Sequence, residues 1–205
     1  MKSKYNLKED NKINPNKKKI KSKMEIQEKA MKMFLEKGYH ATSTSEVCRA
    51  LHISKPTLYW YFKDKEDLLF SIHRDHLKNL LNPILEEMSG ISNPTEKLTI
   101  FIHRYVSVIC QYPELRLLVQ ENMCLGSEHS QWVIEQWQEI LKVLRKTLSQ
   151  LKKDGLAGDF DEAFAALSLI GMCTWPYYWF DYSRPEGMLK LIKTIKKIFF
   201  KGILK

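Results

Sequence analysis

Glycine and proline are scarce in this chain, at 8 and 7 of its 205 residues. With so few residues that break helices, we expect long uninterrupted segments rich in Leu, Ile, Lys and Glu, and no strand pattern is apparent. Hydrophobic residues make up 44% of the chain, which excludes global disorder. The composition therefore favours an all-α fold with a sizeable core.

Sequence patterns typical of enzymes are also absent. There is no glycine-rich phosphate loop and no Ser, His and Asp in a recognisable catalytic order, and the six histidines are scattered. His73 and His76, one helical turn apart, could share a metal with Asp75, although such a pair is more often exposed or already hydrogen-bonded. We therefore expect no catalytic residue, no cofactor and no metal, and keep a metal-dependent enzyme as an alternative.

Cysteine pairs and an apolar leader are missing as well. The four cysteines lie far apart without a CxxC pair, and no apolar signal segment follows the first residue. Such thiols are typical of a reducing compartment, so the sequence predicts a cytoplasmic protein. Residues 163–180 carry no charge and are long enough to raise the question of a membrane span. Because Gly171 and Pro176 interrupt them and no Lys or Arg cluster adjoins them, a helix buried inside a dimer is the better interpretation.

The net charge of +9 is concentrated at one end. Residues 1–23 hold nine lysines against Glu9 and Asp10, a sum of +7, whereas residues 24–76 hold eight basic and eight acidic residues and sum to zero. A lysine-rich stretch with few apolar residues cannot offset its ordering entropy, so we predict a disordered basic tail over residues 1–22. Such a tail either aids solubility or adds non-specific affinity for phosphates.

Helical periodicity divides the rest of the chain into two parts. Residues 23–70 are predicted to form three short helices and the start of a fourth, and residues 71–205 to form longer ones, about nine in all. Ser43 and Glu46 match a capping box at the start of the second helix. Pro56 falls in the first turn of the third helix, where the missing N–H of proline costs nothing. We predict a helix-turn-helix domain over 23–70 and a larger helical domain over 71–205.

The second and third helices carry side chains suited to duplex DNA. In a helix-turn-helix the later helix enters the major groove while the preceding one lies across the backbone. Hydroxyls clustered at a helix start can hold a phosphate, and Lys and Thr can contact base edges. Trp60 fits packing and base contact equally well, and Lys65 is placed for a phosphate. The expected DNA-binding residues are Ser43, Thr44, Ser45, Ser54, Lys55, Pro56, Thr57, Tyr59, Trp60 and Lys65.

Residues 54–69 match the pattern S-x-P-T-L-Y-x-Y-F-x-x-K-E-x-L-L, which is far more specific than a helix-turn-helix alone. On this pattern, residues 25–76 resemble the DNA-binding domain of the TetR family of repressors. The resemblance implies a homodimer on a palindromic operator, released when a small molecule enters a pocket of the C-terminal ligand-binding and dimerisation domain. It also implies phosphate contacts at Thr44 and Tyr59, an anchoring role for Lys65, and base contacts at Ser45, Lys55, Pro56, Thr57 and Trp60.

Two positions depart from the family pattern. Members usually have glycine in the turn where this chain has His52, and a histidine at positive φ is tolerated but strained. Position 45 commonly carries a charged or amide side chain, and the serine here leaves fewer direct readers of bases. A helical interaction protein with a degenerate helix-turn-helix remains an alternative, although the intact Lys55, Thr57 and Tyr59 argue against it.

Apolar and aromatic side chains of the C-terminal domain are candidates for the implied pocket, although core packing alone would also explain each of them. They favour an apolar or aromatic ligand over a sugar. Residues 174–187 also resemble, weakly, the aromatic segment of fatty-acyl-responsive members, which implies a fatty acid or an acyl-CoA. The candidate ligand-binding residues are Phe101, Tyr105, Ile109, Met123, Trp137, Leu141, Met172 and Trp175.

The last two expected helices, over residues 163–180 and 186–203, are the candidate dimer interface. Two helices from each subunit would form a four-helix bundle. Gly171 allows close approach of a neighbouring helix, and exposed aromatic residues are typical interface anchors. The candidate interface residues are Gly171, Trp175, Tyr178, Trp179, Ile192, Ile195 and Phe199.

Overall fold

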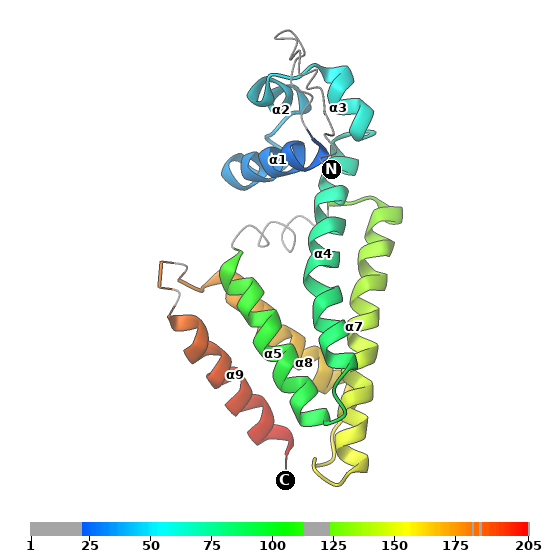
Figure 1. The fold of residues 1–205 in the computed structure, drawn as a ribbon, viewed down its shortest axis with the longest axis vertical. Coiled ribbons are helices and arrows are strands. Elements are labelled where there is room, and N and C mark those ends of the chain that lie inside the picture. The colour runs from blue at the N-terminus through cyan, green and yellow to red at the C-terminus, as the bar shows by residue number, and fades with distance from the viewer. Residues whose placement is uncertain (1–21, 113–123, 182, 185, 205) are drawn as a thin grey trace, which may run out of the picture.

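The computed structural model describes residues 22–112, 124–181, 183–184 and 186–204 (Figure 1). Within these ranges the chain forms eight α-helices and one short 3-10 helix, and the β pairing there is a single isolated bridge between Ala157 and Leu204. The all-α fold class is therefore confirmed. The basic tail expected over residues 1–22 lies outside the described residues, apart from Ser22.

Three short helices form the head of the molecule: α1 (Lys23–Lys37), α2 (Thr44–Leu51) and α3 (Lys55–Tyr61). Local signals set where these helices begin. At α2, the Ser43 side chain accepts from the Glu46 N–H while the Glu46 carboxylate accepts from the Ser43 N–H. Such a box satisfies N–H groups that the first turn leaves unpaired. Ile26, Phe34 and Leu58 are buried between the three helices and form the centre of the head.

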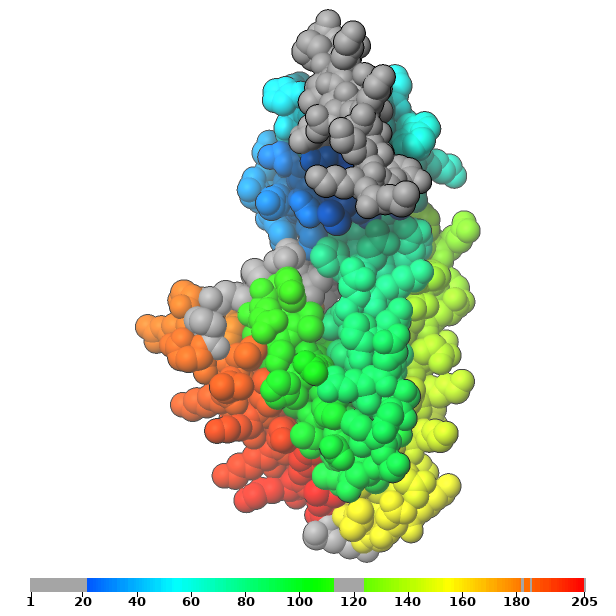
Figure 2. Space-filling model, in the orientation of Figure 1, coloured from blue at the N-terminus to red at the C-terminus, as the bar shows by residue number. Residues whose placement is uncertain are grey.

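The remaining elements are α4 (Lys65–Ser89), α5 (Pro94–Gln111), α7 (Ser127–Lys153), α8 (Glu162–Thr174), η2 (Trp175–Tyr178) and α9 (Gly187–Ile203). Figure 1 shows α4 descending from the head into the larger domain, beside α5 and α7. The helix therefore crosses the boundary that we expected between residues 70 and 71, and the two parts of the molecule share one rigid element. In Figure 2 the narrow head stands above a broader body, with α9 along one edge.

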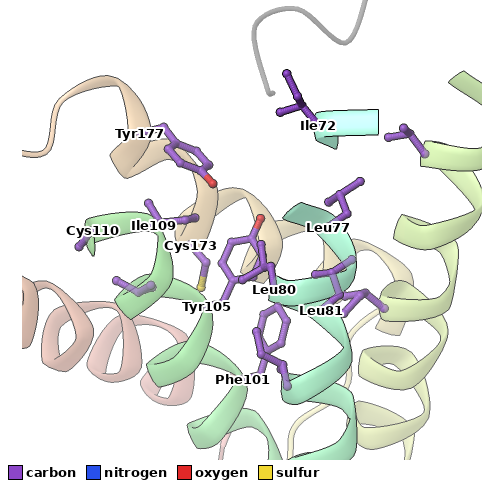
Figure 3. Close-up of a cluster of buried hydrophobic side chains, with 14 of the residues drawn as sticks. Ile72, Leu77, Leu80, Leu81, Phe101, Tyr105, Ile109, Cys110, Cys173 and Tyr177 are labelled. Carbon is purple, nitrogen blue, oxygen red and sulfur yellow. The ribbon is translucent and has the colours of Figure 1, made fainter. Parts of the chain in front are cut away.

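The core of the larger domain surrounds α5, which packs against α4, α7, α8 and α9. Phe101 and Tyr105 are stacked, with ring centroids 5.3 Å apart, and both are buried (Figure 3). The Tyr105 hydroxyl lies 3.1 Å from the Thr174 hydroxyl, which satisfies a polar atom that would otherwise be stranded among apolar side chains. This bond ties α5 to the end of α8.

The charge-free residues 163–180 do not form one continuous helix. α8 ends at Thr174, and a 3-10 turn containing Pro176 follows it, because proline cannot supply the N–H that would continue the α-helix. Among the described residues, no helix is both long and apolar enough to cross a bilayer.

Candidate nucleic-acid interface

The turn between α2 and α3 sets the direction in which α3 leaves the head. His52 adopts φ 55° and ψ 39°, a left-handed conformation, and its N–H donates to the carbonyls of Cys48 and Arg49. The Ile53 N–H closes the turn on the Cys48 carbonyl at 3.0 Å. Within the described residues His52 is the one non-glycine with positive φ. The turn thus keeps the geometry that glycine usually supplies, at some strain in the backbone.

The exposed side of α3 presents the residues expected to contact DNA. Lys55 and Pro56 are exposed, and Trp60 is 77% exposed, its ring meeting Tyr61 edge-on. A tryptophan that packs into a core would not remain so accessible. Of the two interpretations of Trp60, the structure therefore favours contact with a partner over packing within the head.

Two hydroxyls from different helices meet beside this surface. The Thr44 hydroxyl at the start of α2 lies 3.3 Å from the Tyr59 hydroxyl on α3. Either oxygen can donate, so the pair leaves one proton available for a phosphate oxygen. The structure thus brings together the two residues to which the resemblance assigns phosphate contacts.

Ser43, Ser54 and Thr57 are engaged in helix caps. The Ser54 side chain accepts from the Thr57 N–H at 3.2 Å, and its hydroxyl lies 2.8 Å from that of Thr57. The Ser43 hydroxyl faces the Glu46 carboxylate at 2.9 Å. Hydrogen bonds from the backbone and then the side chain of Ser43 hold the pKa of Glu46 down to about 2, so this cap is charged at neutral pH. These serines position the two helices, while Ser45 is half-buried in the first turn of α2.

Lys65 points back into the head. Its Nζ donates to the His40 carbonyl at 3.4 Å and lies 4.2 Å from the centroid of the Tyr39 ring. Both contacts are to the segment between α1 and α2. This geometry favours the anchoring role over a phosphate contact, because the ammonium group already has partners within the protein.

The candidate pocket residues separate into three groups. Phe101, Tyr105 and Ile109 are fully buried, Trp137, Leu141 and Met172 are half-buried, and Trp175 is 63% exposed. The Trp137 ring meets Tyr105 at a centroid distance of 6.1 Å, so these two residues lie together with Phe101. Trp175 stands apart on the surface, and Met123 lies outside the described residues.

Sequence reasoning missed two buried polar atoms in this domain. Nε2 of His73 on α4 and Oγ of Ser107 on α5 are buried and have no hydrogen-bond partner among the described residues. Burial lowers the pKa of His73 to about 4, so its imidazole is neutral near pH 7. Nothing in the sequence distinguishes the buried His73 from the half-buried His76. Asp75, the third suggested metal ligand, instead accepts from Gln27 and Arg74, and the described residues contain no cluster able to hold a metal.

The candidate dimer residues differ in exposure. Gly171, Trp175, Tyr178 and Trp179 are exposed, whereas Ile192, Ile195 and Phe199 are at most 5% exposed and pack into the body of the chain. Four further apolar side chains, which were not among the candidates, point outward from α8 and α9. They are Phe164, Leu167, Leu189 and Ile198, between 51% and 72% exposed.

Both parts of the chain match models of known protein families. A model of the TetR-family bacterial regulatory proteins matches residues 26–72, and a model of the tetracycline-repressor-like C-terminal domain matches residues 92–203, more than half of the chain. The chain belongs to the TetR family. The two matched ranges reproduce the division into head and body seen in the fold.

Individual TetR proteins share the fold at moderate identity. The regulator PfmR of Thermus thermophilus is 28% identical, with a TM-score of 0.78 over 86% of this chain and 97% of its own. AibR, solved with isovaleryl coenzyme A and operator DNA, is 24% identical, with a TM-score of 0.78 over 87% of this chain and 97% of its own. The fatty acid metabolism regulator protein of Bacillus subtilis strain 168 is 27% identical over 97 residues, 47% of this chain and half of its own length.

Proposed function

We propose that this TetR-family chain is a homodimeric transcriptional repressor that binds a palindromic operator and is released by a small apolar ligand. The observation that carries the proposal is the outward surface of α3 and the start of α2. Lys55, Pro56 and Trp60 are exposed there beside the paired hydroxyls of Thr44 and Tyr59. Polar groups that can contact phosphates and base edges stand on a helix of the size that fits the major groove.

Dimerisation follows from the apolar surface of α8 and η2. Phe164 and Leu167 are exposed on neighbouring turns of α8, and Trp175 is exposed where η2 begins, with Gly171 one turn after Leu167. Large apolar side chains gathered on one face mark a protein interface, and a two-fold dimer would bury each patch against its copy. We assign the interface to this surface, with Tyr178 and Trp179 beside it and Leu189 and Ile198 on α9.

An apolar effector is supported by the core around α5 and by the relatives. The stacked rings of Phe101 and Tyr105, with Trp137 beside them, would favour an acyl or aromatic group over a sugar. The B. subtilis relative is named for fatty acid metabolism, and AibR, which shares the fold, was solved with an acyl coenzyme A. We propose a fatty acid or its coenzyme A thioester. Such a ligand acts only if it binds the DNA-incompetent arrangement more tightly.

The proposed regulator works in the cytoplasm and has no enzymatic activity. The B. subtilis relative and PfmR are named as regulators, and repression requires access to the chromosome. The proposed arm of residues 1–22 would add phosphate affinity without changing the preferred sequence. Its deletion should weaken binding modestly and leave the selected site unchanged.

Selection of bound duplexes from a random pool tests the proposal directly. We expect an enriched palindrome, bound by a dimer with a dissociation constant that rises steeply with salt. Addition of palmitoyl-CoA or palmitate to that complex should then release the DNA. A monomeric protein that binds no duplex at low ionic strength would overturn the repressor assignment.

A further inference from the structure

The first turn of α4 is fastened to the start of α7 through one carboxylate oxygen. Oε1 of Glu66 accepts from the Gly126 N–H at 2.8 Å and lies 2.8 Å from Nδ1 of His129. The second distance is that of a hydrogen bond in which Nδ1 carries the proton. Glu66 is thus the acceptor for two donors that belong to the body of the protein.

Ring packing holds the histidine that partners this carboxylate. The His129 ring is stacked on Phe70, with centroids 4.0 Å apart and planes 11° from parallel, and Phe70 meets Trp132 edge-on. At Gly126 an added Cβ would come within 2.9 Å of Oε1 of Glu66, so an alanine there would push the carboxylate away from its two donors. We call Glu66, Gly126 and His129, with Phe70, the α4–α7 clamp.

The head is in turn fastened to α4. The Gln27 amide of α1 donates to the Ser71 hydroxyl at 3.1 Å and to the Asp75 carboxylate at 2.7 Å. Lys65, one residue before Glu66, holds the segment between α1 and α2. The recognition helix α3 therefore moves together with α4. The α4–α7 clamp sets the tilt of α4 relative to the body.

We propose that Glu66 is a positioning residue that fixes the separation of the two recognition helices, and with it the spacer length that the dimer accepts in an operator. The inference rests on the proposed function, since it requires a dimer on a palindrome. The proposed interface lies on α8 and η2 of the body, whereas α3 lies in the head at the upper end of α4, so a change in the tilt of α4 would alter the distance between the two copies of α3 (Figure 1). One added base pair displaces a half-site by about 3.4 Å and also rotates it around the duplex.

Binding to operators of altered spacing is the test. Half-sites taken from the selected palindrome are joined with the native spacer and with spacers one base pair shorter and longer. The full-length parent should lose at least tenfold in affinity on either altered spacer. Three variants loosen the clamp by different chemistry, namely Glu66→Ala, Gly126→Ala and His129→Ala. Each should bind the native palindrome about five- to tenfold more weakly and discriminate between spacers by less than about threefold.

Controls separate positioning from general damage. Glu86→Ala removes the same charge from an exposed position of α4 and should keep the parent's spacer preference. Glu66→Gln retains an oxygen acceptor and should stay close to the parent. Affinity for an isolated half-site should be equal in all of these proteins, because the head itself is unchanged. Should one alanine variant fail to fold in circular dichroism, the other two carry the test.

The outcomes distinguish the two proposals. If the parent binds a selected palindrome and the loosened variants keep its spacer discrimination, the positioning role of Glu66 is wrong and the repressor assignment stands. If the parent binds no palindrome at all, both the proposed function and the positioning role of Glu66 are wrong.

Discussion

The two exposed surfaces that we assign to partners differ in polarity. On α2 and α3 the exposed groups include the cations Arg49 and Lys55, the hydroxyl of Tyr59 and one large indole at Trp60, whereas α8 presents Phe164 and Leu167, 72% and 51% exposed. The first surface suits a hydrated polyanion whose binding releases counterions and weakens with salt. The second suits a partner that removes apolar area from water and persists in salt. Salt should therefore dissociate the DNA complex before it dissociates the dimer.

A charge on the outer face of α8 should have the largest effect. Leu167→Glu would bury a carboxylate in the proposed dimer interface, where it has no partner. We expect a monomer in analytical ultracentrifugation and a loss of more than about 100-fold in palindrome affinity, since each half-site would then be bound alone.

Leu156→Glu is the matched control for this variant, because Leu156 is 47% exposed in the connection between α7 and α8. It should remain dimeric and bind DNA as the parent does. A dimeric Leu167→Glu protein with full operator affinity would show that the interface lies on another surface.

The body of the protein also contains a polar exception, the buried His73. Its folded pKa of about 4 lies below the ordinary value of 6.5, so the unfolded chain binds the proton more tightly and stability is lost as pH falls between these values. Between pH 7.5 and 4.5 the protonation of His73 alone should lower the free energy of unfolding by roughly 2 to 3 kcal/mol. Urea unfolding at both pH values should show this loss in the parent and its absence in His73→Leu.

His103→Leu is the control for the histidine experiment, because His103 is exposed on the neighbouring helix α5. It should keep the full pH dependence of the parent. An equal dependence in His73→Leu and in the parent would mean that other groups cause the acid sensitivity.

Local signals made the head predictable from the sequence. Ser43 with Glu46, Ser54 with Pro56, and the turn at His52 each act within a few residues, and the structure has a helix start or a turn at each. The family pattern then supplied roles for side chains that the same segment exposes. Thr44 and Tyr59 meet because two short helices are held at one angle by one turn.

The body was predictable only as a set of helices. Which side of α9 faces the core depends on where α5 lies, and that is a long-range contact with no local signature. The sequence pattern therefore places Ile192 and Phe199 in the dimer interface, whereas α9 buries them in its own subunit. No local pattern predicts the burial of His73 or the α4–α7 clamp either, because their surroundings come from segments distant in sequence.

Within the head, Thr57 tests whether the polar surface reads bases. Thr57→Ala removes a methyl and a hydroxyl from α3, and we expect a loss of about 1 kcal/mol with relaxed preference at one base position. Thr194→Ala, the same truncation on an exposed part of α9, should change neither quantity. An unchanged site preference after selection with Thr57→Ala would remove this residue from the base-reading set.

The smallest effect distinguishes the two lysines that flank the recognition helix. Lys55 is exposed at the start of α3, while Lys65 is held by the His40 carbonyl and the Tyr39 ring. Each phosphate contact contributes about 0.9 to the slope of log affinity against log salt concentration. Lys55→Ala should therefore flatten that slope by about 0.9, whereas Lys65→Ala should weaken binding by loosening the head and leave the slope unchanged. Fluorescence anisotropy across a salt series measures the affinity and the salt slope of each variant. A flattened slope for Lys65→Ala would show that Lys65 contacts a phosphate.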